Sequence, residues 1–184
     1  MDQHQAMDDL KAIRQIMGRV RRTSGGGGGW FMVLWGVILL IGFSGSQFLS
    51  DVYVGGMWAV LNVSGMAISV WLGIRMGRRS GISSPIWRSI LLWWLSLGTF
   101  DVLLVWLFRL GDHDIALLSI LTVALGYVLF GLFSHWIISA VGALMALLAV
   151  GAMLLIPNYF SLAIGVLIGG LLIGSGLWLV REEG

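Results

Sequence analysis

The longest apolar stretch of the chain, residues 115–156, constrains the fold most because it contains no Asp, Glu, Lys, Arg or Pro. As one helix it would be about 63 Å long at about 1.5 Å per residue, which is twice the hydrocarbon thickness of a bilayer, about 30 Å. The stretch therefore has to fold back on itself, and Ser134-His135-Trp136 is its most polar place to turn. It predicts two membrane helices, 115–136 and 137–156.

The chain contains further apolar runs that are long enough to cross a bilayer as helices. The chain of 184 residues is 58% hydrophobic and 11% charged, whereas a soluble domain carries about 25% charged residues. Pro157-Asn158 predicts the last turn. The predicted fold is therefore all-α, a polytopic transmembrane helical bundle in domain 30–184, with membrane helices at 30–49, 53–74, 86–110, 115–136, 137–156 and 159–180.

Residues 1–24 form the one substantial polar segment. Apolar side chains recur there at steps of three and four, which predicts an amphipathic juxtamembrane helix with one apolar stripe: Met7, Leu10, Ile13, Met17 and Val20. Its basic residues predict attraction to anionic lipid headgroups or docking of a soluble protein partner, and the two readings are compatible. They are Lys11, Arg14, Arg19, Arg21 and Arg22.

The glycine run 25–29 has the composition of a phosphate-binding loop but not its pattern. No Lys-Ser or Lys-Thr follows the run, and no predicted strand precedes it. We interpret it as a flexible linker between the amphipathic helix and the first membrane helix.

The distribution of basic residues predicts the orientation. Residues 1–24 hold five bases, the segment 75–88 holds four, and Arg181 lies at the C-terminus. The intervening loops hold Asp51, Asp112 and Asp114, with Arg109 as their single base. By the positive-inside rule both termini are cytoplasmic, which requires an even number of spans. We do not expect a nucleic-acid partner, because the net charge is only +2 and the basic residues are clustered on one predicted side of the membrane.

Asp101 is the candidate functional residue, since a carboxylate inside an apolar span is costly unless it gains a partner, a proton or water. With each span centred in the bilayer, Asn62 and Thr122 fall at a similar depth. We expect Asp101 to point inward and to accept a hydrogen bond from one of them. It is either a proton or cation site, or a structural group that fixes the register of its helix.

Glycines in the last helix predict close helix packing, because small residues let helix backbones approach in lipid. Gly165 and Gly169 have the GxxxG spacing, as do Gly170 and Gly174. Packing inside the bundle and formation of a homo-oligomer both remain open.

The sequence offers little for catalysis. It has no cysteine, and His4, His113 and His135 are too scattered to form a metal site. No serine–histidine–acid or paired-carboxylate arrangement occurs within the spans. We therefore expect neither an enzyme nor a bound cofactor or metal.

One short segment carries a resemblance. Leu10, Ile13, Arg14, Met17 and Arg19, followed by Ser24-Gly25 and a six-helix body, resemble a family of uncharacterised bacterial multi-pass membrane proteins with an L-x-x-I-R-x-x-M-E-R helix. Here Gly18 replaces the glutamate, and a glycine run replaces the usual apolar turn. The resemblance implies a bacterial plasma membrane setting and no established activity.

Two functions remain as hypotheses. The first is a non-enzymatic interaction or regulatory subunit of the membrane that docks a partner through residues 7–22. The alternative is a small proton-coupled transporter that uses Asp101. A solid, glycine-packed bundle would favour the first function, and a continuous polar cavity reaching Asp101 would favour the second.

Overall fold

The computed structural model describes residues 28–80, 86–133 and 136–182, and every long element in these ranges is an α-helix. The first described helix is Gly28–Phe48. The elements that follow are α2 (Asp51–Ser80), α3 (Ile86–Phe108), α4 (Asp112–Phe133), α5 (Trp136–Leu155), the 3₁₀ turn η1 (Pro157–Tyr159) and α6 (Phe160–Glu182). The predicted amphipathic helix, with its five basic residues, lies outside the described residues. Of the predicted turn Ser134-His135-Trp136, the first two residues also lie outside them, and Trp136 is already the first residue of α5.

The prediction of an all-α membrane-type bundle is confirmed at this level. Five helical segments are long and apolar enough to cross a membrane: Gly28–Phe48, Asp51–Arg75, Asp114–Leu132, Trp136–Leu155 and Pro157–Glu182. The described apolar part of α3, Leu92–Phe108, is shorter. The fold is thus all-helical, with several helices suited to cross a membrane, and each helix satisfies its own backbone hydrogen bonds, as a membrane span requires.

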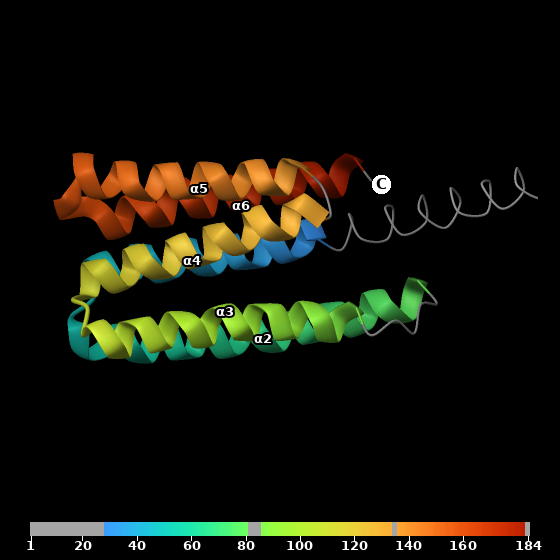
Figure 1. Cartoon of the computed structure of the whole chain (residues 1–184), viewed down its shortest axis with the longest axis horizontal. Helices are drawn as coiled ribbons and strands as arrows, with labels where there is room; N and C mark the ends of the chain where they lie inside the picture. The colour runs from blue at the N-terminus through green and yellow to red at the C-terminus, as the bar shows by residue number, and fades with distance from the viewer. Residues whose placement is uncertain (1–27, 81–85, 134–135, 183–184) are drawn as a thin grey trace, which may run out of the picture.

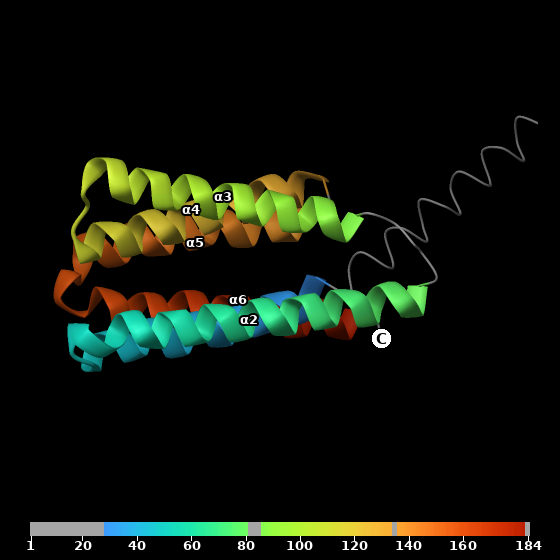
Figure 2. The same ribbon diagram turned by 90° about the horizontal axis from the view of Figure 1, so that it is seen from below.

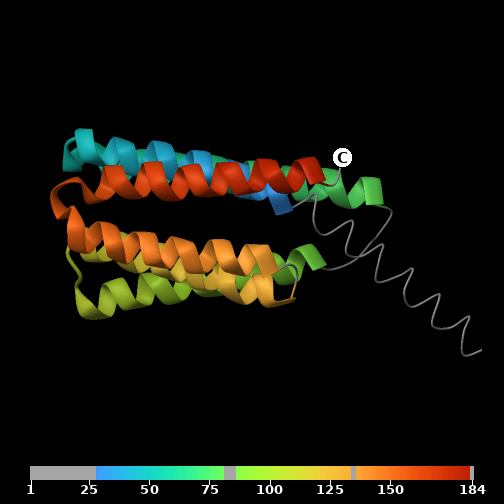
Figure 3. The same cartoon turned by 90° about the horizontal axis from the view of Figure 1, so that it is seen from above.

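The helices form two layers of three (Figures 1, 2 and 3). One layer contains the Gly28–Phe48 helix between α2 and α6, and the other contains α4 between α3 and α5. The layers lie closest where α5 meets α6, and Figure 2 shows α2 and α3 at the opposite, more separated side. Within this arrangement α2 and α3 occupy the periphery.

The buried core confirms this division. Its residues come from the Gly28–Phe48 helix, α4, α5 and α6, and among the described residues α2 and α3 contribute none. The largest fully buried side chains are Phe160, Ile120, Met145, Ile164, Ile168 and Leu172. Four helices therefore form the packed centre, and each peripheral helix is attached to one of them.

Glycine joins the first described helix to the last one. A Cβ atom built on Gly36 would lie 2.9 Å from the carbonyl oxygen of Gly169, and one on Gly29 would lie 2.7 Å from that of Gly176. A Cβ on Gly165 would meet the Oγ of Ser44 at 2.9 Å. Residue numbers rise on one helix as they fall on the other, so the two helices are antiparallel, and Gly28 and Glu182 lie at the same end of the bundle (Figure 1).

Glycine also permits close backbone contact between α4 and α5. A Cβ on Gly142 would lie 2.7 Å from the carbonyl oxygen of Ala124. Gly131 contacts the backbone of Ser139, whose Oγ donates a hydrogen bond of 2.6 Å to the carbonyl oxygen of Val128. The absence of side chains at the crossing points lets the two helices pack at short range, with a hydroxyl–carbonyl bond between them.

The two glycine pairs of α6 differ in their surroundings. Gly165 and Gly169 pack inside the bundle, whereas nothing among the described residues lies within 4 Å of a Cβ built on Gly170 or Gly174. Packing inside the bundle is therefore corrected for the second pair, and a contact in a homo-oligomer stays a prediction for it. Five residues at about 100° per residue separate the two GxxxG pairs by about 140° around the helix, so both cannot face one neighbour. The predicted linker 25–29 is also too long, because Gly28 and Gly29 are already helical.

The close contact predicts a difference between two adjacent glycines of α6. In Gly169→Ala the new methyl group forces the helices apart, and we expect a loss of about 1–3 kcal/mol of unfolding free energy. Gly170→Ala, on the open face, should change stability by less than about 0.5 kcal/mol. Reversible unfolding in mixed micelles, followed by tryptophan fluorescence, measures both. Equal effects of the two substitutions would contradict the packing described above.

Candidate functional site

The α3–α4 hairpin positions the candidate site. α3 ends at Phe108, and Arg109 adopts a left-handed backbone with φ of 48°, which turns the chain sharply. α4 then begins at Asp112, and the N–H of Ile115 donates to the carbonyl oxygen of Gly111 at 2.9 Å. Because this connection is short, α3 and α4 are antiparallel neighbours, and residues equally far from the turn lie at the same level.

Asp101 faces α4 across this hairpin. The Oγ of Ser119 donates to its Oδ2 at 2.7 Å, and the Oγ1 of Thr122 donates to its Oδ1 at 3.3 Å. Ser119 and Thr122 are three residues apart and therefore share one face of α4. The carboxylate is half-buried, and both of its oxygens accept hydrogen bonds from hydroxyl groups. The arrangement provides the polar partners that a carboxyl group requires in an apolar span.

Ser119 is the member of this site that the sequence prediction missed. The prediction compared the depths of separately centred spans and so considered only Asn62 and Thr122. Counting from the turn provides a better signal, because Asp101 lies seven residues before the end of α3 and Ser119 lies seven after the start of α4. In an antiparallel hairpin these positions fall opposite each other.

Asn62 is not part of this site. Its Nδ2 donates to the carbonyl oxygen of Trp58, one turn earlier on α2, at 2.9 Å, and its side chain is exposed. The predicted contact between Asn62 and Asp101 relied on their similar depth in the bilayer. In the structure α3 packs on α4, whereas α2 packs on the Gly28–Phe48 helix. The predicted cluster therefore reduces to Asp101 and Thr122, with Ser119 added.

Aromatic side chains also pack between α3 and α4, farther from the turn than Asp101 and Ser119. The rings of Trp94 and Tyr127 meet edge to face, with centroids 5.6 Å apart. A Cβ on Gly126 would lie 2.8 Å from Leu97 and 3.0 Å from the ring of Trp94, so this glycine makes room for the indole. Trp94 is thus a packing residue. The Nε1 of Trp93 is buried and has no hydrogen-bond partner among the described residues.

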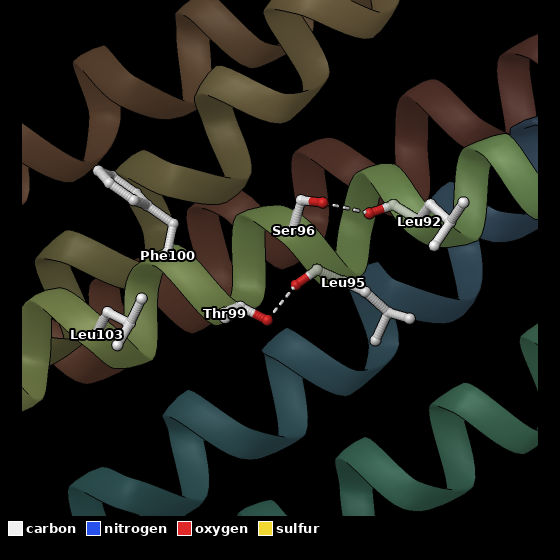
Figure 4. Close-up of a pocket in the computed structure, with 6 residues that line it drawn as sticks. All are labelled: Leu92, Leu95, Ser96, Thr99, Phe100 and Leu103. Atoms are coloured by element: carbon white, nitrogen blue, oxygen red, sulfur yellow. Dashed lines mark hydrogen bonds between the residues drawn. The ribbon is translucent and has the colours of Figure 1, made fainter.

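An open pocket of about 400 Å³ lies on α3 (Figure 4). By the helical period its lining residues lie on the face of α3 opposite Asp101. Its lining residues are Leu92, Leu95, Ser96, Thr99, Phe100 and Leu103. The hydroxyls of Ser96 and Thr99 donate to the carbonyl oxygens of Leu92 and Leu95 on their own helix, both at 2.8 Å. With its hydroxyl hydrogens directed to the backbone, this surface suits contact with lipid chains.

The site contains a carboxyl group and two hydroxyls, which can exchange a proton or fix a helix. Among the described residues no group of three His, Cys, Asp or Glu side chains is placed to hold a metal ion. The chain matches no protein-family model, no curated protein and no solved structure. The interpretation of the site therefore depends on its own geometry.

The hydrogen bonds predict coupling between Asp101 and Ser119. A double-mutant cycle with Asp101→Ala and Ser119→Ala should give a coupling free energy of about 0.6–1.7 kcal/mol, the range of interhelical hydrogen bonds in membrane proteins. Unfolding in mixed micelles measures it. Ser96→Ala is the matched control, since that hydroxyl bonds within α3 and should show no coupling to Asp101. A coupling free energy of zero between Asp101 and Ser119 would contradict the contact.

Proposed function

We propose that this chain is a non-enzymatic, six-span protein of the bacterial plasma membrane that docks a cytoplasmic partner through its N-terminal segment. In this proposal α3 crosses the membrane in addition to the five longer helices, and both termini face the cytoplasm. Support for the topology comes from the antiparallel contact of the first and last helices, because residues 28 and 182 share one end of the bundle. Basic residues near both ends favour the cytoplasmic side.

The observation that carries the functional proposal is the backbone-level packing of the bundle. Between the Gly28–Phe48 helix and α6, and between α4 and α5, helix backbones meet at glycine and leave no room for side chains. Such interfaces suit a rigid scaffold better than a transport pathway. A scaffold of this kind acts by what it binds at its surface.

The N-terminal segment is the proposed docking surface. Its apolar stripe and its basic residues lie on a sequence with helical periodicity, joined to the bundle by glycines. A basic amphipathic helix at the cytoplasmic leaflet can rest on anionic lipid and still present its stripe to a partner helix. Release from the lipid and capture of the partner would then compete for the same apolar face.

A proton-coupled transporter is the second candidate, and the half-buried carboxyl group of Asp101 is the observation that favours it. It has weaker support, because both carboxylate oxygens are bonded to hydroxyls of α4, as in a group that fixes helix register. Under this alternative, Asp101→Asn abolishes a pH-dependent flux into proteoliposomes. Flux that persists unchanged would exclude it.

A charge introduced into the apolar stripe tests the docking proposal. Met17→Asp should reduce crosslinking of the full-length protein to its cytoplasmic partner by tenfold or more, because an aspartate on the stripe is costly to bury. Gln15→Asp adds the same charge on the opposite face of the predicted helix and should leave crosslinking unchanged. The measurement is quantitative mass spectrometry after crosslinking in native membranes, with deletion of residues 7–22 as the baseline. A partner profile that survives the deletion would overturn the proposal.

A further inference from the structure

α2 (Asp51–Ser80) is the least buried of the five described helices that are long and apolar enough to cross a membrane. In the membrane-length windows, 6% of α2 is buried, compared with 33% of the Gly28–Phe48 helix and 39% of the Pro157–Glu182 segment. One narrow face packs on the Gly28–Phe48 helix: Trp58 donates from Nε1 to the Oγ of Ser46 at 3.0 Å, and Gly65 contacts Ile38. The rest of the surface of α2 faces outward.

The outward surface carries an amide at the middle of the span. Asn62 lies one residue from the centre of Asp51–Arg75, and no charged residue occurs between these two ends. Its Nδ2 has one partner, the carbonyl oxygen of Trp58. Its Oδ1 accepts no hydrogen bond from any described residue. An exposed amide at this depth would face hydrocarbon, where an unmet polar group is costly.

The residues around Asn62 permit another helix to approach closely. Gly55, Ala59 and Met66 lie on the same side of α2 at helical spacing, and all are exposed. Nothing among the described residues lies within 4 Å of a Cβ built on Gly55. The amide therefore stands in a strip of small or flexible side chains, here called the Asn62 face (Gly55, Ala59, Asn62 and Met66).

We propose that the Asn62 face is the contact surface for a second copy of this chain, in a parallel two-fold dimer within the membrane. A primary amide has both a donor and an acceptor, so two amides related by a two-fold axis satisfy each other with reciprocal N–H···O bonds. Copies inserted in the same orientation bring Asn62 to the same depth in both α2 helices.

This pairing is independent of the docking proposal, because the Asn62 face lies in the span and not in the N-terminal segment. It also explains why a central span carries an outward amide at all. A partner protein of different sequence would need its own amide at the same depth, whereas a second copy provides one by symmetry.

Single cysteines test the contact, since the chain has none of its own. In native membranes treated with a mild oxidant, Ala59→Cys and Met66→Cys should give disulfide-linked dimers. Val60→Cys is the matched control, since it lies at the same depth, is 69% exposed, and points about 100° away from Ala59 around the helix. Dimers with the first two and none with Val60→Cys support the proposal. Equal crosslinking at all three positions, or none at any, overturns it.

The amide itself is tested by Asn62→Leu, which places an apolar side chain on a surface that already faces outward and so leaves the fold intact. Photobleaching steps of labelled full-length protein in nanodiscs report the dimer fraction. Loss of two interhelical hydrogen bonds should shift the equilibrium toward monomer by about tenfold. Asn62→Gln, which keeps the amide, should retain part of the dimer. An unchanged dimer fraction in Asn62→Leu would overturn the assignment of Asn62.

Discussion

The close antiparallel contact between the Gly28–Phe48 helix and α6 is the constraint on which the rest of the structure depends. In lipid, apolar surface gives helices no reason to associate with each other, so association relies on close packing and hydrogen bonds. Gly29, Gly36, Gly165, Gly169 and Gly176 provide that packing between the first and last described helices. The contact brings Gly28 and Glu182 to the same end of the bundle, and the two helices share one core with α4 and α5. α2 and α3 are then left outside it.

The peripheral helices α2 and α3 each carry one strongly polar side chain near mid-span, Asn62 and Asp101, and the two side chains have different surroundings. α3 is fixed to α4 by the carboxyl group of Asp101 and the hydroxyls of Ser119 and Thr122. Asn62 of α2 has no equivalent opposite it, and its amide is directed outward. One polar group therefore acts within the chain, and the other is the proposed site of contact between chains.

Much of the fold could be predicted from the sequence because the long apolar runs and Pro157 are strong local signals. α5, expected at 137–156, occupies Trp136–Leu155, and α6, expected at 159–180, occupies Phe160–Glu182. Neighbour relations were harder to predict. Depth suggested that Asn62 reaches Asp101, but depth does not determine which helices touch. Counting from the Arg109–Gly111 turn would have found Ser119. The Gly170 and Gly174 pair shows the same limit, since a GxxxG spacing does not say whether a neighbour is present.

The proposed topology, with six spans and both termini in the cytoplasm, is the claim on which the functional account depends, and side-specific labelling tests it directly. Single cysteines at Ser24, Ser80, Asp112 and Gly184 are treated with a membrane-impermeant maleimide in intact cells and then in inside-out vesicles. The account predicts that only Asp112→Cys reacts in intact cells and that the other three react in the inside-out vesicles. Reaction of Ser80→Cys and Asp112→Cys from the same side would show that α3 does not cross, and would contradict the account.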